Sequence, residues 1–333
     1  MKPLKYLFIS SMLFAATSCG NSWLDLEPST SVDTETSIKI LSDVEFTLNG
    51  IYSTMQSSDA YSGRLVYYGD VTGDDMQAVS STKRVANYYR FNFTKDDNPS
   101  SHWSYLYSII QNCNLILMNI DKLVIDEDDK AYRDDLKGEA LAIRGLALFD
   151  LTRIFGYPYL KDDGASLGVP IIEGLSTIDS KPTRNTVAQC YTRIIDDLTQ
   201  SLSLLGEKFN KGKINKWGAM VLLSRVYLYK GENANALKMA SDAIIGAEKN
   251  KYALWTNEDY PTAWGEDASA SKPGEVLFEI VNLTTDSPGK ESMGYLNSYD
   301  GYDDMCITCS FYQFLKEDPK DIRLKLLSFD KKY

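Results

Sequence analysis

Histidine is almost missing from this 333-residue sequence, which has only His102. A single histidine without a nearby nucleophile is weak support for acid–base catalysis, and no serine-hydrolase, zinc-protease, phosphate-loop or dinucleotide-binding motif accompanies it. A glycosidase needs only two carboxylates, and the 46 acidic residues leave such a pair open. No spacing singles one out, so we predict a protein that is not an enzyme and has no catalytic residues.

Basic residues are also scarce. The chain has 35 Lys and Arg residues against 46 Asp and Glu residues, which gives a formal net charge of -11. The basic residues form no cluster that could contact phosphates, so the composition argues against nucleic acid and disfavours a polyanionic ligand. Because 44% of the residues are hydrophobic, the chain can still bury a sizeable core.

There are only five cysteines. Cys113 and Cys190 fall within helical patterns and are expected to be buried as apolar residues. Cys306 and Cys309 have the spacing of a zinc half-site or a redox pair, but no second pair of ligands accompanies them. We therefore predict no metal and no cofactor. For this pair, a short local disulfide and two free thiols remain the alternatives.

Beyond the N-terminus, no run approaches the roughly 18 apolar residues that a membrane-spanning helix needs. The first residues instead have the pattern of a secretory signal, with two lysines followed by the apolar run Leu7 to Ala16. Small residues then lead to Cys19, where a bacterial lipoprotein would carry its lipid. We expect a signal peptide over 1–18, lipidation of Cys19 and a polar tether over 19–36. The alternative is a simple secretory signal that happens to contain a cysteine.

Apolar residues recur at steps of three and four along much of the remaining chain, which predicts helices. The predicted helices cover residues 38–55, 103–123, 138–160, 182–198 and 214–245. Trp103 lies in helical phase with Tyr107, so we expect it in the core rather than as a platform for a sugar ring. Asn185 or Thr186 could cap the fourth of these helices.

The stretch 138–160 is the centre of this pattern. Its apolar residues repeat every seven positions, and Gly156 and a following proline end it. Arg144 and Arg153 lie among these apolar residues, and a guanidinium in a core must find carboxylate or carbonyl acceptors. Asp150, one turn before Arg153, is an available partner.

A repeat unit occupies residues 214–245. Its residues fall at the spacings of a tetratricopeptide repeat, where small side chains let paired helices approach closely. The matching positions are Met220, Leu223, Ser224, Tyr227, Gly231, Ala236, Ala240 and Ala243, of which Met220, Ser224 and Ala240 depart from the consensus. We therefore predict a mainly α fold with a tetratricopeptide-like helical-repeat body.

Two long segments lack helical periodicity, residues 57–101 and the chain after residue 249. Only Glu275 to Asn282 reads as a strand, because Val276, Phe278 and Ile280 alternate with other residues, so we expect little β structure. Long irregular segments on a rigid helical body are usually where ligands are held. We predict that these segments form an irregular, loop-rich ligand-binding face.

Tyrosine is abundant, with 22 residues, and many lie in these irregular segments. A glycan site needs flat aromatic faces surrounded by hydrogen-bonding side chains, although any single loop tyrosine is more often there to pack its own loop. The candidate platforms are Tyr88, Tyr89 and Trp264, with Tyr295, Tyr299 and Tyr302 in reserve, and the candidate hydrogen-bonding partners are Arg84, Asn87 and Asp75.

Six segments, in order along the chain, resemble the SusD/RagB family of outer-membrane nutrient-binding lipoproteins of Bacteroidetes. They are Trp23–Leu24–Asp25, Leu48 to Tyr52, Trp103 with Tyr107 and Asn114, Glu139 to Pro158, Pro182 to Leu198, and Tyr312 to Arg323. The resemblance therefore covers nearly the whole chain after Cys19, and 37–333 is expected to be one SusD/RagB-like domain. Family members normally continue further, so the C-terminal part of the family fold is expected to be missing.

The resemblance implies a lipid-anchored protein of the outer membrane, facing the cell exterior. It would capture a polysaccharide or oligosaccharide and deliver it to a SusC-like TonB-dependent transporter, with no bond made or broken. Two alternatives stay open: a RagB-like protein that captures peptides, and a helical-repeat adaptor that binds other proteins. The resemblance identifies neither the ligand nor its contact residues.

Overall fold

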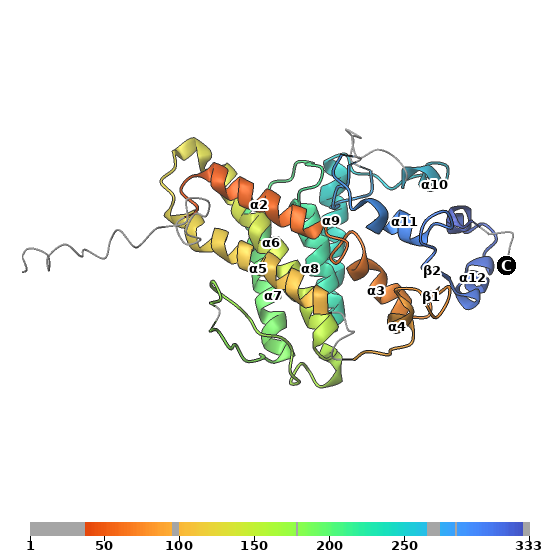
Figure 1. Ribbon diagram of the computed structural model, residues 1–333. Helices are drawn as coiled ribbons and strands as arrows, with labels where there is room; N and C mark the ends of the chain where they lie inside the picture. The colour runs from red at the N-terminus through yellow and green to blue at the C-terminus, as the bar shows by residue number, and fades with distance from the viewer. Residues whose placement is uncertain (1–36, 95–99, 178, 265–273, 284, 329–333) are drawn as a thin grey trace, which may run out of the picture.

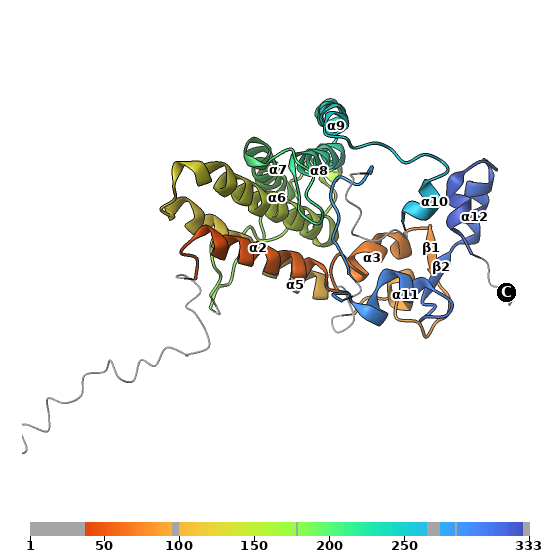
Figure 2. The same cartoon turned by 90° about the horizontal axis from the view of Figure 1, so that it is seen from above.

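The computed structural model describes residues 37–94, 100–177, 179–264, 274–283 and 285–328. One part is an array of helices that lie side by side (Figures 1 and 2). It contains α2 (Leu41–Met55), α5 (Ser100–Asn119), α6 (Lys130–Phe155), α7 (Val187–Leu204), α8 (Lys216–Lys230) and α9 (Asn233–Lys249). None of the helices in the described part of the chain has both the length and the hydrophobicity of a membrane span.

Helix α6 is the centre of this array, because it contacts α2, α5, α7 and α8. Nearly every residue from Gly138 to Thr152 is buried, which confirms the predicted core helix. The helix begins at Lys130, earlier than the apolar pattern indicates, because its first two turns are mostly polar and only Leu136 among residues 130–137 is buried. It ends at Phe155, and the amide of Gly156 donates to the carbonyl of Thr152 at 3.0 Å.

The guanidinium of Arg144 is buried between three helices. It donates to both carboxylate oxygens of Asp197 on α7, at 2.8 and 2.7 Å, and to the side-chain oxygen of Asn114 on α5, at 2.8 Å. Asp197 is 1% exposed, so both charges of the pair are out of water. A buried guanidinium is tolerated only with such acceptors, as the sequence predicted, and the pair fixes how α5, α6 and α7 pack.

The second predicted pair is also present. Arg153 forms an ion pair with Asp150, the partner expected one turn earlier. Asp150 also accepts a hydrogen bond from the hydroxyl of Tyr61 at 2.7 Å, which ties α6 to the segment after α2. The Arg153 guanidinium lies 4.8 Å from the ring centre of Phe149 and 5.3 Å from that of Tyr229, so aromatic faces cover it.

Helices α8 and α9 form the tetratricopeptide-like pair expected over 214–245. Gly231, which follows α8, has φ of 84°, the left-handed conformation that glycine adopts without strain. Ala236 and Ala243 are buried, and a Cβ placed on Gly246 would come within 2.0 Å of the Trp217 ring. Small side chains therefore allow the two helices to approach closely.

Other local predictions are confirmed. Thr186 caps α7, since its side-chain oxygen accepts from the amide of Gln189 at 3.2 Å. Cys113 and Cys190 are both buried. Trp103 packs against the core, with its ring centre 4.9 Å from that of Tyr107 and 5.0 Å from that of Phe155.

A second part of the fold lies beside the helical array and combines two distant stretches of sequence (Figures 1 and 2). The first supplies α3 (Arg64–Thr72), β1 (Met76–Ala78) and α4 (Ala86–Tyr89). The second supplies α10 (Tyr260–Ala263), α11 (Met293–Asn297), β2 (Met305–Ile307) and α12 (Cys309–Lys316). The short 3₁₀ turns η7 (Gly289–Glu291) and η8 (Ile322–Leu326) flank these elements. In the helical array, η4 (Ile120–Lys122) and η5 (Glu127–Asp129) lie between α5 and α6, and η6 (Tyr159–Lys161) follows α6.

Two expectations about this part are corrected. Residues 57–101 are not wholly irregular, because α3 buries Tyr67 and Val71, four positions apart, against Val85, Leu296 and Met305. The strand predicted over 275–282 is absent, since these residues pair with no strand in the described chain. Phe278 instead packs on the helical array, 6.3 Å from the Tyr52 ring centre, so its apolar pattern reflects packing rather than a sheet.

Glu139 on α6 is buried and shares one hydrogen-bond network with α2. Tyr52 donates from its hydroxyl to the Glu139 carboxyl at 2.6 Å and accepts from the amide of Ile214 at 3.1 Å. Burial raises the pKa of Glu139 from 4.5 to about 7; the Tyr52 hydrogen bond and Lys213 oppose the shift, while Asp135 and Glu45 add to it. The carboxyl is therefore protonated in the folded protein at pH values where the unfolded chain has lost the proton.

This shift predicts how stability depends on pH. Because the pKa of Glu139 is raised in the folded state, its contribution to the free energy of unfolding is fully present below about pH 4.5. That contribution is lost as the pH rises through about 7. We expect Glu139→Gln to remove that dependence. The free energy of unfolding of the wild type should fall relative to the variant by up to about 3 kcal/mol between pH 5 and pH 8. Urea unfolding of both proteins at the two pH values measures this, and a difference that does not change with pH would contradict it.

Candidate functional site

The two distant stretches of the second part meet at a two-stranded antiparallel ribbon. Met76 pairs with Ile307, Gln77 with Cys306, and Ala78 with Met305. Backbone hydrogen bonds extend the pairing at both ends, from Val79 N to Asp304 O at 3.2 Å and from Thr308 N to Asp75 O at 2.9 Å. The ribbon therefore brings residues 76–79 and 304–308 to one place.

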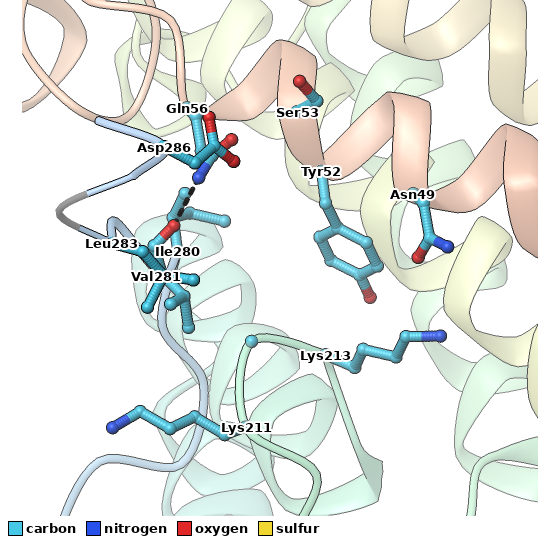
Figure 3. A pocket seen from close by; sticks show the side chains of 11 residues that line it. Asn49, Tyr52, Ser53, Gln56, Lys211, Lys213, Ile280, Val281, Leu283 and Asp286 are labelled. Atoms are coloured by element: carbon cyan, nitrogen blue, oxygen red, sulfur yellow. Dashed lines mark hydrogen bonds between the residues drawn. The ribbon is translucent and has the colours of Figure 1, made fainter. Parts of the chain in front are cut away.

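A cavity of about 420 Å³ lies along α2 (Figure 3), a cleft of about 740 Å³ lies between α3, α6 and α8, and a cavity of about 610 Å³ lies against the ribbon. We call the cavity against the ribbon the ribbon groove. Its lining comes from the ribbon, the end of α11, the start of α12 and the end of η8. Its polar and aromatic lining includes Gln77, Asn297, Tyr299, Asp303, Thr308 and Tyr312. The groove thus combines two tyrosines with amide, carboxylate and hydroxyl groups.

Tyr299 is the candidate platform that lines this groove, and its side chain is 51% exposed. Beside it, the side-chain oxygen of Asn297 is buried and accepts no hydrogen bond from the described residues. Asp303 has φ of 49°, a left-handed conformation that is uncommon outside glycine and that recurs at functional sites. Sequence reasoning named Tyr299 but missed Tyr312, Asn297 and Gln77, because only the ribbon pairing brings them beside it.

Three other candidates, Arg84, Tyr295 and Tyr302, are brought together next to the groove. The Arg84 guanidinium donates to Asp304 at 2.9 Å and to Glu291 at 2.8 Å, and it lies 4.0 Å from the Tyr302 ring centre. Tyr302 also packs edge-on against Tyr295, with ring centres 5.1 Å apart. These contacts already occupy Arg84, so it joins the two stretches and positions the groove instead of presenting free donors to a ligand.

The remaining candidates near α4 and the ribbon have different environments. Tyr88 is buried, with its ring centre 5.6 Å from Tyr68 and 5.8 Å from Phe93, so it packs the core and offers no open platform. Tyr89 beside it is 40% exposed. Asn87 is partly buried, and Asp75 is exposed at the end of the ribbon, where its carbonyl accepts from the amide of Thr308.

Trp264 lies in a separate aromatic cluster. Its ring centre is 5.1 Å from that of Trp255 and 5.6 Å from that of Tyr260, both in edge-on contact, and 58% of its surface is exposed. Helix α10, which precedes Trp264, contacts η8, and Leu326 at the end of η8 lines the ribbon groove. The exposed tryptophan therefore lies on an element that contacts η8 but does not itself line the groove.

The cysteine pair lies in the groove as two exposed free thiols. Cys306 is in β2, and Thr308 before Cys309 is extended, with ψ of 153°. Three extended residues span about 10 Å, which exceeds the Cα separation of about 7 Å that a disulfide allows. Of the two alternatives, the structure has the free thiols. Among the described residues, no three His, Cys, Asp or Glu side chains gather as metal ligands would.

His102 is fully buried on α5. Its Nδ1 lies 3.0 Å from the carbonyl oxygen of Asp59, and its ring packs edge-on against Tyr68 at 5.8 Å. Burial lowers its pKa, while the Asp59 contact opposes the shift. The ring therefore helps to hold the segment after α2 on the helical array and has no access to a ligand in the groove.

Comparison with known proteins places the sequence among SusD-like proteins. The profile of the SusD-like family, described as starch-binding and associating with the outer membrane, matches residues 22–228. SusD-like protein P2 of Formosa agariphila is 28% identical over 311 residues, which cover 90% of this chain and 57% of the relative. A SusD-like protein of Bacteroides ovatus is 26% identical over 222 residues, covering 66% of this chain and 38% of that one.

Solved structures with the same fold agree. A protein of Bacteroides vulgatus, provisionally described as sugar-binding, is 82% identical with a TM-score of 0.87, and the match covers 90% of this chain and 67% of that one. A laminarin-binding SusD-like protein is 19% identical with a TM-score of 0.66, covering 85% and 66%, which shows a shared fold. The chain thus spans 57% of the Formosa relative's length.

The position of Arg84 predicts what its removal does. Arg84→Met keeps much of the side-chain length but loses the hydrogen bonds to Asp304 and Glu291. We expect faster hydrogen exchange of the backbone amides of residues 289–308, while the amides of α6 stay protected. Exchange measured by mass spectrometry checks this. Arg323→Met is the matched control, because among the described residues Arg323 forms its ion pair with Asp321, two positions earlier. Equal exchange in the wild type and Arg84→Met would contradict the assigned role.

Proposed function

Because the chain belongs to the SusD-like family, described as starch-binding and associating with the outer membrane, we propose that it binds a polysaccharide or oligosaccharide in the ribbon groove. The observation that carries this proposal is the composition of the groove: two tyrosines beside amide, carboxylate and hydroxyl side chains in one cavity of about 610 Å³. The provisional sugar-binding description of the 82% identical protein supports the same class of ligand.

The groove suits the chemistry of a sugar. A pyranose ring presents apolar C–H faces that stack on aromatic rings, and its hydroxyl groups need donors and acceptors around its edge. Tyr299 and Tyr312 would supply the faces, while Gln77, Asn297 and Asp303 would supply hydrogen bonds. The laminarin-binding protein with the same fold is a precedent for a glucose polymer, so laminarin and starch are the first ligands to test.

We propose that binding is reversible and that the protein is not an enzyme. The description of the family as starch-binding supports a binding role. The bound glycan would be delivered to a SusC-like TonB-dependent transporter in the same membrane. Tyr89 and the cluster around Trp264 would extend the contact for longer glycans, because both present exposed aromatic rings.

Membrane attachment is part of the same proposal. Cys19 follows the expected signal peptide and lies outside the described residues, as do the signal and the tether over 19–36. A lipid on Cys19 would hold the protein at the outer membrane, facing the cell exterior, where polysaccharides are available. The family description, which includes association with the outer membrane, supports this location.

Truncating the exposed platform tests the groove. Tyr299→Ala should weaken glycan binding at least tenfold, about 1.4 kcal/mol, because an aromatic anchor is lost from the wall of the groove. A glycan array including starch and laminarin identifies the ligand, and calorimetric titration measures its affinity.

Tyr157→Ala is the matched control for this titration. Tyr157 is 54% exposed but packs under Lys161 at the end of α6, away from the groove. Full affinity in a folded Tyr299→Ala protein would remove the ribbon groove as the binding site. Binding of a peptide library with no glycan bound would instead favour the peptide-capturing alternative.

The anchor can be tested separately. Cys19→Ala should release the protein from membranes, because the lipid on Cys19 is its only proposed hold on the bilayer and stable anchoring needs at least two acyl chains. Fractionation of cells that express the wild type or the variant measures it, with Cys113→Ala as a control for the loss of a thiol. A variant that still sediments with the outer membrane would contradict the lipid anchor.

A further inference from the structure

Two exposed thiols line the ribbon groove and have no part in the proposed glycan contacts. Cys306 lies in β2 and Cys309 is the first residue of α12, and both are free. Cys113 and Cys190 are buried in the helical array, where burial raises the pKa of the Cys113 thiol to about 12 and also raises the pKa of Cys190. Because the thiolate is the reactive form, the groove thiols are the reactive pair among the described cysteines.

Each thiol lies next to a side chain that the proposed glycan would contact. Cys306 is directly opposite Gln77 in the ribbon, and the Gln77 amide donates to the Cys306 sulfur at 3.7 Å. Cys309 lies one turn before Tyr312 on α12, and both line the groove. A cavity of about 610 Å³ has the size of a site for one small ligand. A group attached to either sulfur would therefore take up space that a sugar ring needs.

The chain between the two cysteines is held extended, so the thiols do not close on each other. Thr308 donates from its amide to the Asp75 carbonyl at 2.9 Å and from its hydroxyl to the Asp74 carbonyl at 2.6 Å. Its hydroxyl oxygen also accepts from the amide of Phe311 at 3.2 Å, which caps α12. A second thiol close to the first would release a group bound there by disulfide exchange. Here that release would break the hydrogen bonds of Thr308, so a bound group stays until an external thiol removes it.

The charges around the groove indicate which disulfides fit it. The lining includes the carboxylate of Asp303, and the Nζ of Lys316 lies 5.3 Å from the ring centre of Tyr312. A small disulfide that carries both ammonium and carboxylate groups offers a partner to each of these charges. Cystine, the disulfide of the amino acid cysteine, has this chemistry.

We propose that Cys306 and Cys309 undergo disulfide exchange with cystine, and that the resulting adduct regulates glycan binding. The protein thiolate attacks one sulfur of the cystine S–S bond and forms a new S–S bond to its own sulfur. The S–S bond of cystine breaks, and the released cysteine thiolate takes up a proton. The protein sulfur is oxidised while the released sulfur is reduced, so no further oxidant is needed. The bound half-cystine fills the groove, and a free thiol reverses the step.

The proposed location supplies the co-reactant, because disulfides form and persist in oxidising environments such as the cell surface. The regulation rests on the proposed function, since it acts on the groove that would hold the glycan. The exchange reaction itself does not depend on that function.

Mass spectrometry of the lipid-free Cys19→Ala chain tests the exchange. After incubation with cystine, peptides prepared without reductant should carry half-cystine on Cys306, Cys309 or both, at least tenfold faster than on Cys113 and Cys190. Dithiothreitol should remove it, and the Cys306→Ser/Cys309→Ser double variant should take up none on the same timescale. Folded protein in which neither groove thiol reacts would overturn the proposal. So would a disulfide between Cys306 and Cys309 in place of the adduct.

Calorimetric titration with laminarin, soluble starch and any further glycan that the array identifies tests the regulation. The adduct should bind at least tenfold more weakly than the reduced protein and regain full affinity after dithiothreitol. The double variant should bind equally with and without cystine. Unchanged affinity of the adduct, while the reduced protein binds, would overturn the regulation and leave the glycan site in place. Reduced protein that binds no glycan would instead contradict the proposed function, and the regulation with it.

Discussion

The ion pair between Arg144 and Asp197 is the constraint on which the helical array depends. Both groups are buried, and the guanidinium also donates to Asn114, so one side chain joins α5, α6 and α7. Asn114 in turn donates to the carbonyls of Ile172 and Gly174, which fixes the loop before α7. Removing one partner of a buried pair typically destabilises a protein by about 3–5 kcal/mol, because the other charge remains without compensation.

The helical array positions the second part of the fold through contacts with the segment that leads to α3. Tyr61 reaches Asp150 on α6, and His102 on α5 contacts the carbonyl of Asp59, so the chain that leads to α3 is fixed from two helices. From there, the ribbon and Arg84 join residues 76–90 to residues 289–308. The ribbon groove is thus a product of contacts between segments more than 200 positions apart, held on a helical core.

Local patterns in the sequence predicted the long helices of the array and the α8–α9 pair, because spacing, capping and glycine conformation act over a few residues. They missed α3 and the polar start of α6. The partner of Arg144 could not be predicted, since any of several carboxylates could have met it. The sequence could not predict the groove either, because its residues come from distant segments. Composition pointed to Tyr299, but Tyr312 shares the groove lining with it through the pairing of β1 with β2. The prediction of Tyr88 as an open platform was wrong because its ring is buried against α3. The predicted strand over 275–282 was wrong because its apolar residues pack on the helical array.

The central claim is that a glycan occupies the ribbon groove. A crystal structure of the protein with the oligosaccharide that the array identifies tests it most directly. The account predicts a sugar ring stacked on Tyr299 or Tyr312, with hydroxyl groups hydrogen-bonded to Asn297, Gln77 or Asp303. A sugar bound instead in the cleft of about 740 Å³ between α3, α6 and α8, with the ribbon groove empty, would contradict it.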